Sequence, residues 1–141
     1  MENNTNKKEV PIKPHGYHIA HLNAQSMSNK FTNIYFLLKT KHIDILSINE
    51  TWLTEIHPND SFNFDGYKIH RLDRSSRGGG VMLLITNKLK SFTENTIMNS
   101  SLELIHVSVD IPFSKSINII SFYKPPTALP TDFFNSLTYF L

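Results

Sequence analysis

The sequence contains no cysteine, so disulfide bonds and cysteine-ligated zinc sites are excluded. It also has no run of the roughly 18 apolar residues that a membrane-spanning helix requires, so we expect no membrane partner. The formal net charge is only +2, which is too small to indicate nucleic-acid binding by itself. What remains is a globular composition of 141 residues, 40% hydrophobic and 18% charged, which is long enough to bury one core.

The first 16 residues differ in composition from the rest of the chain. They are mostly polar, carry Lys7, Lys8 and Lys13, and lack the apolar stretch of a secretory signal peptide. We predict a flexible polar leader at residues 1–16 and a single domain at residues 17–141.

Apolar periodicity predicts alternating strands and helices, and therefore an α/β fold. Phe31, Ile34, Tyr35 and Leu38 recur at helical spacing, after a possible cap at residues 28–29. This helix lies between two predicted strands, and the three elements together span about thirty residues. Such a strand–helix–strand unit favours parallel pairing of the two strands. The expected strands are 17–22, 43–49, 67–72, 81–86, a half-exposed strand at 105–111, and 117–123.

Two further segments complete this prediction. The polar stretch 88–101 is expected to be a loop. A last helix is expected to begin at Thr131 as its cap, with Phe133, Phe134 and Leu137 on its apolar face.

Three polar residues lie where predicted strands end, and chemistry in α/β proteins gathers at strand ends. They are Asn23, Glu50 and Tyr123. Each also has an ordinary interpretation, because Asn23 suits a turn, Glu50 suits a surface position, and Tyr123 suits a half-buried strand residue. Spacing alone leaves both interpretations open.

All three arginines of the chain, Arg71, Arg74 and Arg77, precede the glycines at 78–80. A guanidinium group presents a planar fork of donors that suits phosphate. The equal alternative is a solvated basic loop paired with Asp73. The three glycines do not match a nucleotide-binding fingerprint, and we expect them to let the chain turn tightly into a buried strand.

Six short motifs, taken in order, give the sequence a resemblance to a known family. Their order and spacing are similar to those of the endonuclease/exonuclease/phosphatase family, and within it to the endonuclease domain of non-LTR retrotransposons. The motifs are Leu22-Asn23-Ala24-Gln25-Ser26, Ile48-Asn49-Glu50-Thr51-Trp52-Leu53, Gly66-Tyr67, Asp73-Arg74, Arg77-Gly78-Gly79-Gly80-Val81 and Tyr123-Lys124-Pro125-Pro126.

The resemblance implies a four-layered α/β/β/α sandwich, of which this chain would form roughly the first half. It implies that Glu50 binds Mg²⁺ or Mn²⁺, that Asn23 helps to hold the metal and phosphate, and that the Tyr123 hydroxyl lies near the phosphate. It further implies DNA as the partner, a reverse transcriptase domain in the full-length element, and a nuclear location.

The positively charged candidates for phosphate or DNA contact are Arg74, Arg77 and Lys124. Together with Arg71, they also support an alternative function, in which the chain is a degenerate, non-catalytic remnant of the same fold that binds nucleic acid or protein.

The sequence departs from the family in its second half. A Gly-Asp-Phe-Asn-like segment and a Ser-Asp-His-like segment, which would activate the attacking water, do not occur. We therefore expect a fragment of a phosphodiesterase that lacks its general base and is inactive alone.

Overall fold

The computed structural model describes residues 16–62 and 64–141, and residues 1–15 of the expected leader lie outside the described residues. In the described residues, no helix is long and apolar enough to cross a membrane. The elements in chain order are β1 (Ile19–Asn23), α1 (Phe31–Thr40), β2 (Ile45–Asn49), a short 3-10 helix (Asn59–Ser61), β3 (Tyr67–Leu72), β4 (Val81–Thr86), β5 (Lys90–Met98), β6 (Glu103–Asp110), β7 (Ile117–Tyr123) and α2 (Pro130–Phe140).

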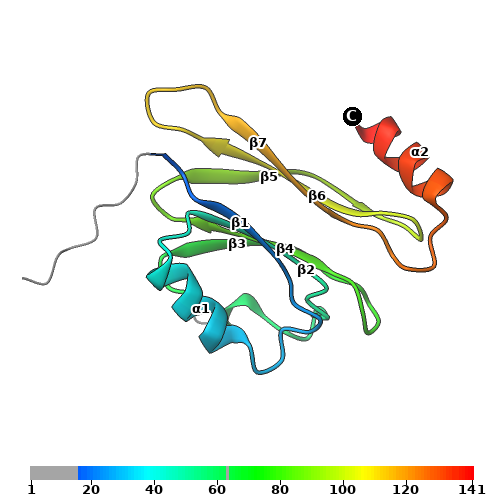
Figure 1. Cartoon of the computed structure of the whole chain (residues 1–141), viewed down its shortest axis with the longest axis horizontal. Helices are drawn as coiled ribbons and strands as arrows, with labels where there is room; N and C mark the ends of the chain where they lie inside the picture. The colour runs from blue at the N-terminus through cyan, green and yellow to red at the C-terminus, as the bar shows by residue number, and fades with distance from the viewer. Residues whose placement is uncertain (1–15, 63) are drawn as a thin grey trace, which may run out of the picture.

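The strands form two sheets that pack face to face between two helices (Figure 1). The first sheet has the order β1-β2-β4-β3 and carries α1 on its outer face. The second has the order β5-β6-β7 and carries α2 on its outer face. This arrangement confirms the predicted α/β/β/α class.

Strand β4 shows how the layers are held together, because all six of its residues are buried. Met82 and Leu84 face α1, whereas Val81, Leu83 and Ile85 face the second sheet. A strand covered on both faces reads as a continuous apolar run, which is why the sequence identified it.

The predicted strand–helix–strand unit is confirmed, since β1 and β2 pair in parallel through α1. Ile34 and Leu38 are buried on the predicted face of the helix. The predicted cap at residues 28–29 is wrong, because the N-cap is Lys30 and no side chain caps the helix. Asn29 instead adopts a left-handed φ of 61° in the turn that precedes the helix.

The expected loop at 88–101 is wrong, because Lys90–Met98 forms β5. This strand pairs antiparallel with β6 and contains an irregularity between Thr93 and Asn95. Most of its side chains are exposed, so it has no apolar pattern. Backbone pairing with β6 makes it a strand, and a local reading of the sequence cannot detect that pairing.

The last helix begins two residues earlier than predicted, because its N-cap is Leu129 in place of Thr131 and Pro130 lies in its first turn. Proline suits that place, because the first amides of a helix have no partner within it. Phe133 is buried against Leu104 of β6, so the outer face of this predicted half-exposed strand is partly covered. Phe134 is 60% exposed and does not belong to the apolar face.

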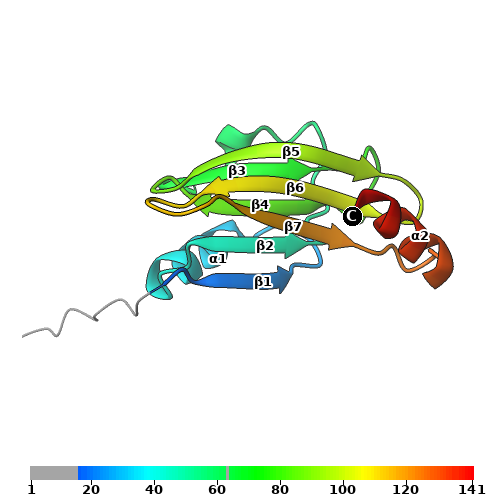
Figure 2. The same cartoon turned by 90° about the horizontal axis from the view of Figure 1, so that it is seen from above.

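Strands β1, β2 and β7 run in one direction, so their carboxyl ends lie at the same end of the molecule (Figure 2). The second sheet lies over β3, β4 and β2, and β1 extends beyond β7. Ile19 of β1 is consequently 56% exposed, although its side chain is on the face directed toward the second sheet.

Candidate functional site

The three strand-end residues come together in the structure. Asn23 is the last residue of β1, Glu50 directly follows β2, and Tyr123 is the last residue of β7. The Nδ2 of Asn23 donates a hydrogen bond to Oε1 of Glu50 over 3.0 Å. The Tyr123 hydroxyl lies close enough to the same carboxylate for Glu50 to raise the Tyr123 pKa through its charge and hydrogen bonding. An amide, a carboxylate and a phenol thus form one connected cluster.

Two contacts between the sheets bring β7 close to β2. The Nδ2 of Asn49 donates to the backbone carbonyl of Phe122 over 2.9 Å. The hydroxyls of Ser47 and Ser121 lie 2.7 Å apart. These contacts explain why Tyr123 reaches Glu50 across the sandwich. Our sequence reasoning missed the role of Asn49, although an amide at the end of a buried strand was a signal.

The backbone at Glu50 is in the left-handed region, with φ at 55°. This conformation costs a side-chain-bearing residue about 1 kcal/mol or more, so the surrounding structure must enforce it. The Glu50 carbonyl accepts the Ser26 amide at 2.8 Å, and the Thr51 amide donates to the Gly80 carbonyl at 3.3 Å. The carboxylate is therefore presented from a turn that is clamped on both sides.

The triple glycine supplies one side of this clamp. A Cβ on Gly80 would lie 2.4 Å from Oγ1 of Thr51, and one on Gly79 would lie 2.4 Å from Nε of Arg74. Both glycines have positive φ, and Trp52 donates its amide to the Gly79 carbonyl at 3.0 Å. The prediction of a tight turn into a buried strand is confirmed.

The environment of Tyr123 changes the acidity of its hydroxyl. Burial is the largest influence and raises the pKa above 10.0, and the negative charge and hydrogen bond of Glu50 raise it further. Nearby Arg74 opposes these effects in part. The phenol therefore stays protonated at neutral pH and can act as a hydrogen-bond donor.

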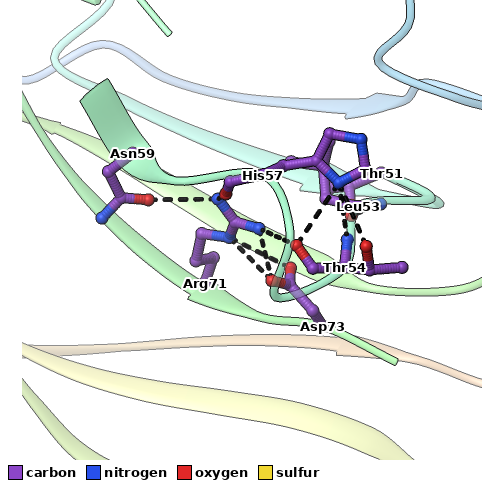
Figure 3. A network of polar contacts seen from close by, with 7 residues as sticks. All are labelled: Thr51, Leu53, Thr54, His57, Asn59, Arg71 and Asp73. Carbon is purple, nitrogen blue, oxygen red and sulfur yellow. Dashed lines mark hydrogen bonds and ion pairs between the residues drawn. The ribbon is translucent and has the colours of Figure 1, made fainter. Parts of the chain in front are cut away.

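Arg71 holds the loop that follows Glu50 through hydrogen bonds from all three of its guanidinium nitrogens (Figure 3). Its Nη1 donates to the His57 carbonyl at 2.6 Å, and its Nη2 donates to the Thr54 carbonyl at 3.0 Å. Its Nε donates to Oδ2 of Asp73 at 2.9 Å. The pairing with Asp73 that the sequence suggested exists at Arg71, where it is part of a structural brace.

Arg74 is bound to Glu103, a carboxylate of β6 that is 0% exposed. The other oxygen of Glu103 accepts the Gly80 amide at 2.6 Å. Glu103 also lies directly opposite Tyr123 in the β6–β7 pairing. It thus links the second sheet to the glycine turn and neutralises the Arg74 guanidinium. Sequence reasoning missed Glu103, although a single carboxylate between Leu102 and Leu104 was a signal.

Arg77 and Lys124 lie differently from the other two cations. Arg77 is exposed, and its Cζ lies 5.0 Å from the centre of the Trp52 ring. Lys124 directly follows Tyr123, and its Nζ donates to the Pro125 carbonyl at 3.3 Å. A hollow of about 460 Å³ lies between residues 73–76, 98–100 and 125–127, beside Arg74.

No protein-family profile matches the chain, and no curated protein matches it in sequence. Solved structures do match its fold. The endonuclease domain of TRAS1, a telomere-specific non-LTR retrotransposon, has a TM-score of 0.60 at 10% identity, over 88% of this chain and 52% of that domain. TDP2 of D. rerio, solved with a single-strand DNA product, has a TM-score of 0.65 at 10% identity, with the same coverage.

An AP endonuclease from Archaeoglobus fulgidus has a TM-score of 0.56 at 20% identity, over 77% of this chain and 41% of that one. These proteins share the endonuclease/exonuclease/phosphatase fold, and this chain has that fold. The chain spans about half the length of the proteins that it resembles in structure.

Proposed function

We propose that this chain carries one half of a metal-dependent phosphodiesterase site that acts on DNA, as in a DNA-nicking retroelement endonuclease. The observation that carries the proposal is the convergence of Asn23, Glu50 and Tyr123 from the ends of three strands. Together they offer hard oxygen ligands and hydrogen-bond donors, which are the groups that hold a divalent cation and a phosphate oxygen.

The donor set fits an open Mg²⁺ or Mn²⁺ site. Within residues 16–62 and 64–141, no three His, Cys, Asp or Glu side chains gather into a closed cage. Mg²⁺ needs only one or two protein carboxylates and keeps several waters, so Glu50 would hold it while Asn23 orients the carboxylate. When bound, the cation would polarise the phosphate and stabilise the negative charge that develops.

The remaining groups would position the DNA. The protonated Tyr123 hydroxyl would donate to a phosphate oxygen, because its raised pKa keeps the proton in place. Lys124 and the exposed Arg77 would offset phosphate charge, and the hollow beside Arg74 would accommodate the strand. The Arg74 charge is already neutralised by Glu103, so we place less of the phosphate contact on it.

The chain alone is expected to bind without hydrolysing. It contains neither a Gly-Asp nor an Asp-His dipeptide, so the implied general base has no counterpart here. A missing general base costs about 10²- to 10⁴-fold in rate. The proposed activity therefore requires a second half-site that supplies this group.

Two measurements test the proposal. Titration of Mn²⁺, followed by the electron paramagnetic resonance of the free ion, should show one site that Glu50→Gln removes and Glu55→Gln retains. Glu55 is the matched control because it is an exposed glutamate five residues away. Supercoiled plasmid with Mg²⁺ should stay intact. Mn²⁺ binding equal in both variants would contradict the metal site, and strong Mg²⁺-dependent nicking that Glu50→Ala abolishes would contradict the missing base.

The second candidate function, a binding remnant without chemistry, is favoured by the exposed charge of Arg77. DNA affinity would then fall with salt and would not depend on a divalent cation. Titrations of DNA at two salt concentrations, each with Mg²⁺ and with EDTA, separate the two functions. Binding that is absent or independent of salt would contradict the remnant function.

A further inference from the structure

The contact between Trp52 and Arg77 has no part in the cluster around Glu50, yet it lies beside that cluster. Trp52 is half-buried and lies two residues after Glu50, so their Cα atoms are at most about 7 Å apart. The Arg77 guanidinium lies over the indole ring, with its Cζ at 5.0 Å from the ring centre. This is a cation–π contact.

Arg77 is distinguished from the other arginines by what surrounds it. Arg71 and Arg74 are held by Asp73 and Glu103 respectively. In the described part of the chain, these are the only ion pairs found for arginine. Arg77 itself is exposed, so one side of its guanidinium faces the ring while its charge remains available to a ligand.

The backbone that carries the indole ring is fixed by a hydrogen bond and by close packing of the preceding residue. Trp52 has a left-handed φ of 56° and donates its amide to the Gly79 carbonyl at 3.0 Å. The preceding Thr51 is 1% exposed and packs so closely on Gly80 that a Cβ there would meet its hydroxyl. A ring on a fixed turn loses little freedom when a ligand binds, which favours recognition.

We propose that Trp52 and Arg77 form a stacking platform for an unpaired nucleobase of a DNA strand whose phosphate lies at Glu50. Aromatic and guanidinium groups both stack on bases, and Arg77 also adds a positive charge toward the backbone. Within a duplex, neighbouring bases cover each base face, so the platform selects single-stranded or locally opened DNA. This inference deepens the proposed function and rests on it for the position of the phosphate.

The same contact has a purely structural alternative, in which Arg77 only fastens the 73–80 loop to Trp52. A brace of that kind would contribute to stability and would be indifferent to DNA. The two roles separate when binding and stability are measured on the same variants.

The chain contains a single tryptophan, so its intrinsic fluorescence reports on the platform directly. We would titrate the full chain in EDTA with a twelve-residue oligothymidylate and, separately, with a twelve-base-pair A·T duplex. Saturable quenching by the single strand is expected, with at least about tenfold weaker binding of the duplex. Equal affinity for the two ligands would overturn the single-strand selectivity.

Variants then assign the binding to the pair. With a dye-labelled oligothymidylate followed by anisotropy, Arg77→Lys should lose about tenfold in affinity, because lysine keeps the charge but has no planar face. Trp52→Leu should lose a similar factor. Lys115→Met is the matched charge control. It removes an exposed cation from the loop before β7, at the end of that strand opposite to Tyr123.

Urea unfolding of each variant completes the test. If Arg77→Lys and Arg77→Met bind the oligonucleotide as tightly as Lys115→Met does, Arg77 is only a brace and the inference is overturned, whatever their stability. A failure of Mn²⁺ binding at Glu50, with oligonucleotide binding intact, would remove the metal site and leave the platform. Loss of oligonucleotide binding with Mn²⁺ binding intact would remove the platform and leave the metal site.

Discussion

Asn23 and Glu50 are 27 positions apart in the sequence, and they are joined by a 3.0 Å hydrogen bond from Nδ2 to Oε1. Parallel pairing of β1 with β2 makes this possible, because Asn23 stands directly beside Asn49, the residue before Glu50. The carboxylate thus receives one of its partners from the neighbouring strand of its own sheet. It receives another, Tyr123, from the opposite sheet.

This relationship predicts that Asn23→Ala weakens divalent-cation binding. The carboxylate of Glu50 would lose a donor that orients it, and the loss of such a partner typically costs about tenfold or more in metal affinity. Competition of Mn²⁺ against a fluorescent chelator would measure the change. Asn33→Ala, on the exposed face of α1, is the control and should bind as the parent does. Equal affinities for both variants would show that Asn23 does not support the site.

The glycine turn predicts a difference between two alanine substitutions. Gly66 and Gly80 share a φ of +86°, so alanine is strained equally at both. At Gly66 the added Cβ meets only the Lys39 ammonium at 3.1 Å, whereas at Gly80 it meets Oγ1 of the buried Thr51 at 2.4 Å. We expect Gly66→Ala to cost about 1 kcal/mol and Gly80→Ala about 1–3 kcal/mol more.

Urea denaturation with matched m-values would measure these free energies of unfolding. If the two variants lose the same stability, the close packing of Thr51 on the glycine turn is not a significant constraint.

His70 predicts a loss of stability in mild acid. It is 4% exposed, and its ring contacts the hydroxyls of Ser91 and Thr93 in the opposite sheet at 2.8 Å each. Burial, and secondarily the charge of Lys68, lowers the pKa of His70 from 6.5 to about 4. Between pH 6.5 and pH 4, His70 therefore binds a proton in the unfolded chain but not in the folded chain. Stability is fully present above pH 6.5 and falls as the pH drops toward 4.

The expected contribution of His70 is about 3 kcal/mol between pH 7 and pH 4. His70→Gln removes this component, so its free energy of unfolding should vary less over that range. His106→Gln, which alters a more exposed histidine bonded to Asn118, should retain the slope of the parent. Identical slopes in parent and His70→Gln would show that His70 does not titrate abnormally.

The charges on the edge strands indicate which edge copies of the chain would use to associate. Edge strands β3 and β5 carry charges, and β5 also has an irregularity, which are features that discourage strand addition. Strand β7 has no charged residue, and neither does β1. Strand β7 has seven residues and β1 has five, and a shorter edge offers fewer backbone groups for pairing. We therefore expect copies of this chain to associate through the edge of β7.

Asn118→Lys places a charge on β7 and should shift the association to higher concentration in sedimentation velocity. Asn95→Lys is the matched control, because it changes an exposed asparagine on the edge strand β5. Association that both variants weaken equally, or neither weakens, would contradict the assignment to β7.

Much of the fold was predictable where burial leaves a local pattern. The run at β4, the helical face of Ile34 and Leu38, and the strand–helix–strand unit all follow from apolar spacing. Strand β5 was not predictable in this way, because it is held by backbone pairing and its side chains are mostly exposed. The cap of α1 was also mispredicted, because the preceding turn places Asn29 in a left-handed conformation.

The sequence by itself determined the chemical groups of the candidate site and the strand ends on which they lie. It could not determine how the three arginines are used. Arg71 braces a loop, Arg74 neutralises a buried carboxylate, and Arg77 lies over Trp52. Those roles depend on the packing of the second sheet against the first, which brings Glu103 to the glycine turn. Charge is a local property of the chain, but the partner that neutralises it is chosen by contacts between residues distant in sequence.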